Sequence, residues 1–139
     1  MAQARIRFLR YDPSRVLNAV DATMAERMVR ATAIVETDVK RSMVGGGDPH
    51  VPSQPGEPPH VDTGDYRRRI HSEVTIRRRR VVGRVISGSV QAMALEFGYA
   101  PHNLKPRPHL RPALARQRER IERVLGARIT GLVGTGRLR

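Results

Sequence analysis

The chain has 139 residues, of which 39% are apolar and only 4% aromatic, and its formal net charge at pH 7 is +13. This length predicts a single domain over residues 1–139 with one modest core, and a core short of large rings favours assembly with neighbouring subunits. The absence of cysteine excludes disulfides and thiolate metal sites, and no apolar run approaches the roughly 20 residues that a membrane span needs. The N-terminal residues lack the apolar stretch of a signal peptide, so we expect a cytoplasmic product.

The basic residues are almost all arginine, because only Lys40 and Lys105 are lysines among the 26 basic residues. Arginine makes forked contacts with carboxylates and phosphates, and a positive field of this size attracts polyanions. Two interpretations stay open. Contact with DNA or with acidic protein partners explains the net charge, whereas the codons of a GC-rich genome explain the preference for arginine over lysine.

The first segment with a clear pattern is residues 14–43, where apolar side chains recur at steps of 3, 4, 4, 3, 4 and 4. This spacing predicts one long helix of roughly 45 Å. Such a helix is long for a domain of this size, so we expect part of it to pack on other subunits. Residues 5–9, which precede it, alternate briefly and predict a short edge strand. The apolar positions of the helix are Leu17, Val20, Met24, Met28, Ala31, Val35 and Val39.

Glycine and proline dominate residues 44–61. Three consecutive glycines at 45–47 end the predicted helix, and prolines then recur at nearly every third position. That spacing favours an extended polyproline II conformation with few internal hydrogen bonds. We expect an extended arm that docks on a neighbouring subunit, and a disordered surface loop is the alternative.

The next segment predicts a hairpin between two short helices. Asp62 or Thr63 can cap a helix at residues 65–70. Residues 71–76 and 81–87 predict two strands, with four consecutive arginines at the tip between them. Residues 90–97 then predict a short helix that ends at Gly98, a residue type favoured at helix C-caps.

A last helix is predicted from Pro108 onwards, with an apolar side that includes Leu110, Ala113 and Ile121. Gly126 weakens this helix, and we expect residues 127–139 to form a flexible or partner-docked tail. The predicted fold is therefore α+β. It combines a long N-terminal helix, an extended Pro/Gly arm, a small antiparallel sheet made by the hairpin, and a C-terminal helix.

No set of reactive side chains converges in the sequence. None of the five histidines pairs with another at i, i+4 on a predicted helix, and no phosphate loop or nucleophile elbow is recognisable. Glu96 is a lone carboxylate among apolar residues, and no neighbour qualifies as a nucleophile or a second acid, which indicates a structural role rather than a general base. We therefore expect no enzyme activity and no catalytic, metal or cofactor site.

Three short phrases occur in a fixed order: PGEPP…DTGDYR at residues 55–67, ALEFG at 94–98 and RPHLRPAL at 107–114. In order and spacing they resemble the small tail-completion proteins of the neck of long-tailed bacteriophages, also known as minor tail components. The resemblance covers residues 14–126. It implies that Glu96 is a structural or interface carboxylate, most simply paired with an arginine. Gln91 stands where the family has Tyr and His109 where it has Phe, so we expect the packing near Phe97 to differ.

The resemblance implies a structural protein of the virion, made in the host cytoplasm and built into the neck. It implies a homo-oligomeric ring, usually a hexamer, that completes the tail and joins it to the head connector, with DNA passing through the lumen. The implied partners are further copies of the chain, the head-closure or connector protein, the tail terminator or tail tube protein, and genomic DNA in transient contact, with no membrane. The alternatives are a tail-terminator ring and, in a different class, a non-specific DNA-binding protein that uses the arginine-rich surface.

On this interpretation the functional residues make protein contacts by burying shared surface, with arginine pairs that set the register between rings. The basic tip has three possible roles: gripping acidic side chains of an adjacent ring, contacting DNA phosphates, or simple solvation. We expect the contact residues to be Gly45, Gly46, Gly47, Pro49, Pro52, Pro55, Pro58, Pro59, Arg77, Arg78, Arg79, Arg80, Glu96, Arg107, Arg111 and Pro112.

Overall fold

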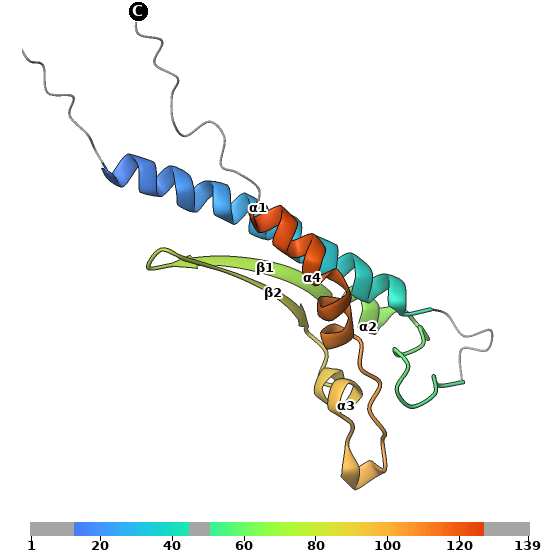
Figure 1. Cartoon of the computed structure of the whole chain (residues 1–139). Coiled ribbons are helices and arrows are strands. Elements are labelled where there is room, and N and C mark those ends of the chain that lie inside the picture. Colours follow the sequence, from blue (N-terminus) through green and yellow to red (C-terminus); the bar gives the residue numbers. More distant parts are fainter. Residues whose placement is uncertain (1–12, 45–50, 127–139) are drawn as a thin grey trace, which may run out of the picture.

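The computed structural model of the chain describes residues 13–44 and 51–126 (Figure 1). Residues 1–12, 45–50 and 127–139 lie outside this description. The strand expected at residues 5–9, the contact residues Gly45, Gly46, Gly47 and Pro49, and the tail beyond Gly126 therefore fall outside the described residues.

The long N-terminal helix is confirmed as α1 (Pro13–Ser42). Its predicted apolar face is buried only towards the C-terminal end, where Val35 and Val39 are 5% and 0% exposed, whereas Leu17 near the start is 40% exposed. Lys40 and Arg41 lie in the last turn, where positive charge interacts favourably with the helix dipole. The first half of α1 thus presents a partly open apolar face.

The hairpin is confirmed as β1 (Ile70–Arg77) paired antiparallel with β2 (Arg80–Ser87), in a register that runs from Ile70 opposite Ser87 to Arg77 opposite Arg80. Ile70 was expected in the preceding helix, but that helix, α2 (Asp65–Arg68), is shorter. Ile70 is fully buried, so the need to place its side chain in the core draws it into the strand.

The short helices have local start and stop signals that differ in part from those expected. Gly64, at φ 80°, is the N-cap of α2, and the hydroxyl of Thr63 accepts the Asp65 N–H at 3.3 Å. Helix α3 (Ala92–Phe97) begins two residues later than predicted and ends at Gly98, as predicted. A short 3₁₀ turn, η1 (Ala100–His102), follows it, and α4 (Leu110–Gly126) begins two residues after Pro108.

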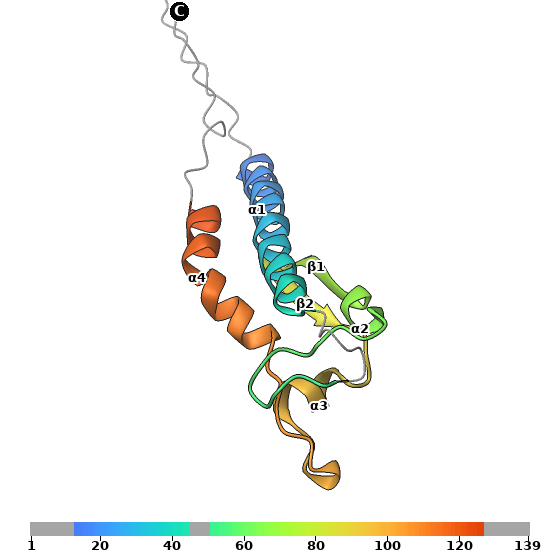
Figure 2. The ribbon, with the colours of Figure 1, turned by 90° about the vertical axis from the view of Figure 1, so that its right-hand side faces the viewer.

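All the long elements pack on α1. The helix lies across the hairpin and beside α4, as the two views of the ribbon show (Figures 1 and 2). The helix approaches the hairpin closely at Gly83, where a Cβ atom would lie 2.5 Å from Cγ2 of Thr32. Polar contacts join the helices: Arg116 donates to the Asp38 carboxylate at 2.8 and 3.0 Å.

The core that results is small. Among the described residues its buried members are Val35, Val39, Met43, Ile70 and Ala113, which come from α1, β1 and α4. It lies at the C-terminal end of α1, where the hairpin strands meet α2 and α4 begins. The predicted α+β fold is confirmed, with its one described sheet formed by two strands.

Candidate protein interface

Glu96 on α3 holds the first turn of α4. Its carboxylate oxygen Oε2 accepts the backbone N–H groups of His109 and Leu110 at 2.9 and 3.0 Å. The other oxygen, Oε1, accepts the backbone N–H of Arg111 at 3.0 Å and its Nε–H at 3.3 Å. The first N–H groups of a helix have no partner within the helix, so this carboxylate, placed 13–15 residues earlier in the chain, caps it.

The environment of Glu96 favours its charged form. Burial alone would raise the pKa of this carboxyl, because the side chain is only 3% exposed. The three backbone N–H groups and nearby His109 outweigh that effect, and the pKa of Glu96 is held below its ordinary value. The predicted pairing with an arginine is present, through Arg111. The carboxylate is buried within its own chain, and a role in partner contact stays a prediction.

His109 stands at the position where the sequence resemblance places Phe, so loss of aromatic packing was expected there. It is fully buried, its Nε2 lies 2.6 Å from the hydroxyl of Tyr66, and its Nδ1 lies 3.0 Å from the carbonyl oxygen of Arg107. The Tyr66 and His109 rings also pack edge to face at 5.4 Å. Burial raises the pKa of Tyr66. The imidazole therefore fills the aromatic site and satisfies its polar atoms, a pairing that the sequence analysis missed.

The arm is folded onto its own chain in the part that the structure describes. The Gly56 N–H donates to the carbonyl of Pro106 at 2.9 Å, and Arg107 Nε donates to the carbonyl of Ser53 at 3.0 Å. Ser53 is 3% exposed and Pro59 is buried. In residues 51–61 the arm thus makes hydrogen bonds within its own chain, and its docking on a neighbouring subunit stays a prediction.

The reversal of the arm has a local cause. Gln54 accepts the Glu57 N–H at 3.1 Å, and Gly56 between them has φ 87°. Proline followed by glycine at positive φ is the pattern of a type II turn, with Pro55 at its second position. Pro106 bonds Gly56 within this turn, and Arg107 bonds Ser53 just before it.

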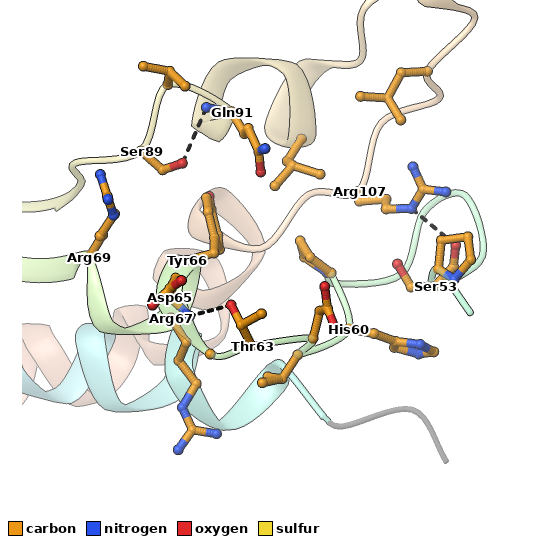
Figure 3. Close-up of a pocket in the computed structure, with 18 of the residues that line it drawn as sticks. Ser53, His60, Thr63, Asp65, Tyr66, Arg67, Arg69, Ser89, Gln91 and Arg107 are labelled. Carbon is orange, nitrogen blue, oxygen red and sulfur yellow. Dashed lines mark hydrogen bonds between the residues drawn. The ribbon is translucent and has the colours of Figure 1, made fainter. Parts of the chain in front are cut away.

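A cavity of about 820 Å³ lies between the folded arm, α2 and the segment before α3 (Figure 3). Figure 3 shows Tyr66 and Arg69 on one side of it and Arg107, bonded to Ser53, on the other. No group of three His, Asp or Glu side chains with the arrangement of a metal site occurs in residues 13–44 and 51–126. The cavity is an open cleft of mixed polarity with arginines at its rim.

The most exposed apolar side chains of this region lie on α3 and in the turn just before it. Val90, in the turn before α3, is 98% exposed, and Met93 and Phe97 on α3 are 69% and 51% exposed. The spacing of four residues places Met93 and Phe97 on the same side of α3. We call these three residues the α3 strip. The guanidinium of Arg111 lies 4.5 Å from the centre of the Phe97 ring, a cation–π contact at the edge of the strip.

The predicted contact residues thus separate into groups. Arg111 borders the α3 strip, Arg107 holds the arm, and Pro112 lies partly exposed on the first turn of α4. Of the described arm prolines, Pro52 and Pro55 are exposed. The four hairpin arginines are all exposed, at the end of the hairpin away from α3 (Figure 1). The sequence analysis missed the strip as an exposed surface, although Val90, Met93 and Phe97 were expected on a common helix.

Comparison of the chain with family models, with curated proteins and with solved structures finds no match. None of the helices in the described part of the chain is long and apolar enough to cross a bilayer.

Proposed function

We propose that this chain is a structural subunit of the neck of a long-tailed bacteriophage. In this proposal, copies of the chain form a ring that completes the tail and joins it to the head connector. The observation that carries the proposal is the α3 strip, an apolar surface held rigidly at the edge of a small core.

The balance of buried and exposed apolar residues supports assembly. In the described part of the chain, six hydrophobic residues are buried, whereas ten large hydrophobic residues are exposed. Exposed apolar side chains that gather along one surface, rather than being scattered singly, mark interaction sites. A subunit that buries such a surface against a neighbour gains the apolar burial that its own core lacks.

The strip has the composition of an interface centre. A Val, a Met and an aromatic ring are bordered by Arg111, and Met, aromatic residues and Arg are enriched in interface cores. Its position is fixed because Glu96, on the same helix, is hydrogen-bonded to the start of α4. In a ring the strip of one subunit would meet a different patch of the next, as heterologous contacts require.

The three sequence phrases that resemble the tail-completion proteins contact one another in the fold. Gly56 of the first phrase is bonded to Pro106 beside the third, and Tyr66 of the first is bonded to His109 of the third. Glu96 of the second caps the helix opened by the third. The phrases therefore specify one structural unit, which is the reason that their order and spacing support the proposal.

A complementation experiment tests it. Phage genomes with the gene deleted are supplied with the wild-type chain, with Met93→Glu or with Val29→Glu, and the lysates are viewed by negative-stain electron microscopy. Val29 is the matched control, because it is an apolar residue 53% exposed on α1, outside the strip. We expect Met93→Glu to fold normally and yet to leave heads and tails unjoined, whereas Val29→Glu restores infectious particles. Wild-type titres with Met93→Glu, or with the gene deleted and no supplied chain, would contradict the proposal.

The same experiment separates tail completion from the tail-terminator alternative. A terminator ends growth of the tail tube, so its loss is expected to give tails of uncontrolled length. Loss of a completion protein is expected to give tails of normal length that do not join heads.

A further inference from the structure

The tip of the hairpin combines high charge with an unfavourable backbone. We call Arg77, Arg78, Arg79 and Arg80 the arginine tip. Arg77 pairs with Arg80 as the last rung of the ladder, which leaves Arg78 and Arg79 as the two turn residues. Their φ angles are 48° and 61°. Positive φ at both central residues defines a type I′ turn, for which Asn-Gly is the preferred sequence and arginine is not.

Two features of the tip reduce stability. Non-glycine residues are disfavoured in the left-handed region, and two like charges directly opposite each other on paired strands repel. The positive charge of the tip is partly compensated by α1, where the carboxylate of Asp21 lies 3.7 Å from the guanidinium of Arg79. Within the part of the chain that the structure describes, Arg77, Arg78 and Arg80 form no ion pair. Strained, uncompensated residues of this kind are a feature of functional sites, and an anionic ligand would supply the missing partners.

The form of the tip favours duplex DNA over an acidic protein surface. A protein interface needs an apolar centre within a polar rim, but four adjacent residues here are all charged and exposed. A two-stranded β-ribbon is also narrow enough to enter the major groove of DNA. We propose that the arginine tip binds the phosphate backbone of duplex DNA without regard to base sequence.

This inference goes beyond the proposed function and does not depend on ring formation. The tip lies beneath the first half of α1, at the other end of the hairpin from α3 (Figure 1). DNA at the tip and a subunit at the α3 strip can therefore be bound at the same time. The failure of one proposal leaves the other intact, since their test variants lie on different elements.

The test compares two double variants of the full chain that remove equal charge. Arg78→Asn/Arg79→Gly installs the preferred turn sequence, and the control Arg120→Gln/Arg123→Gln changes two exposed residues of α4. Binding to a fluorescent 20-base-pair duplex is measured by anisotropy from about 50 to 200 mM salt. Melting temperatures are recorded for both variants.

We expect the tip variant to melt at or above the wild-type temperature while binding DNA more weakly. Its slope of log affinity against log salt should be about 1.8 units shallower, because two phosphate contacts are lost. The control should change that slope by less than about 0.5 units on the same scale. An equal loss of DNA affinity in both variants would overturn the proposal, because binding would then depend on the total charge of the chain and not on the tip. A tip variant that keeps the wild-type DNA slope and loses binding to poly-glutamate would overturn it in favour of an acidic protein partner.

Discussion

The carboxylate of Glu96 accepts the backbone N–H of Leu110 at 3.0 Å, so a residue of α3 caps the first turn of α4. The same carboxylate also bonds His109 and Arg111, and it is only 3% exposed. The two helices therefore behave as one unit, and the orientation of the α3 strip depends on this buried charge.

Removal of that charge is expected to destabilise the fold. Glu96→Gln keeps the shape of the side chain but replaces one acceptor oxygen with an NH₂ group that faces backbone donors. We predict a decrease of about 2 kcal/mol in the free energy of unfolding, measured by urea denaturation, because hydrogen bonds to charged groups contribute about that much. The control Glu122→Gln removes an exposed carboxylate paired with Arg118, and should change stability by less than about 0.5 kcal/mol. Equal effects of the two substitutions would contradict the capping role.

Glu96 also predicts a specific dependence of stability on pH. Its pKa is lower in the folded chain than its ordinary value, so the folded state binds fewer protons at this site than the unfolded state does. The stability from this group is fully present above the ordinary pKa of about 4.3, and is lost as pH falls through the lowered folded value. The unfolding free energy of the wild type should therefore fall more steeply than that of Glu96→Gln between about pH 5 and pH 3. If the unfolding free energies of the two proteins changed in parallel with pH, the lowered pKa of Glu96 would be refuted. Glu36, whose pKa is also lowered, is present in both proteins and cancels in the comparison.

Close packing between α1 and the hairpin predicts a second sensitive site. A Cβ at Gly83 would lie 2.5 Å from Thr32 and 2.7 Å from Met28. Met28 can move, but the β-branched Thr32 side chain on a helix cannot turn aside as easily. Gly83→Ala should cost about 1–3 kcal/mol of stability in thermal or urea unfolding. Gly126→Ala is the matched control, because nothing lies within 4 Å of the added atom there, and it should be neutral or slightly stabilising.

The folded arm predicts an effect of Arg107 on local opening. Arg107→Ala removes the bond from its guanidinium to the Ser53 carbonyl, which holds residues 51–61 against the chain. We expect the amide of Gly56, bonded to Pro106, to exchange its hydrogen about tenfold faster, with little change in the exchange of the α1 amides. Lys105→Ala serves as the control on the same loop. An unchanged Gly56 rate, or a rate already as fast as in an unstructured peptide in the wild type, would contradict the intramolecular docking.

The regular elements could be predicted because their signals are local. The 3-and-4 spacing of Val35, Val39 and their neighbours fixed the long helix, and Gly98 marked the end of α3. The position of the turn at Arg78 and Arg79 could be predicted, but its type could not, because neither residue favours positive φ. Each of these outcomes follows from the preferences of a few adjacent residues.

The arrangement of the site could not be predicted, because its contacts are distant in sequence. The regular proline spacing suggested an extended arm, although the Pro55-Gly56 pair within it is itself a turn signal. Nothing local to Glu96 indicates that it caps a helix beginning at Leu110, and the bond between Tyr66 and His109 joins residues 43 positions apart. The exposure of Met93 could not be predicted either, because it depends on which elements pack against α3 in the folded chain.

Electron cryomicroscopy of the particle neck, at a resolution that distinguishes side chains, tests the central claim most directly. We predict a closed ring of this chain at the head–tail junction, with Val90, Met93 and Phe97 of each subunit buried against the next copy. A neck that lacks this chain, or a ring in which those three side chains face solvent, would contradict the account.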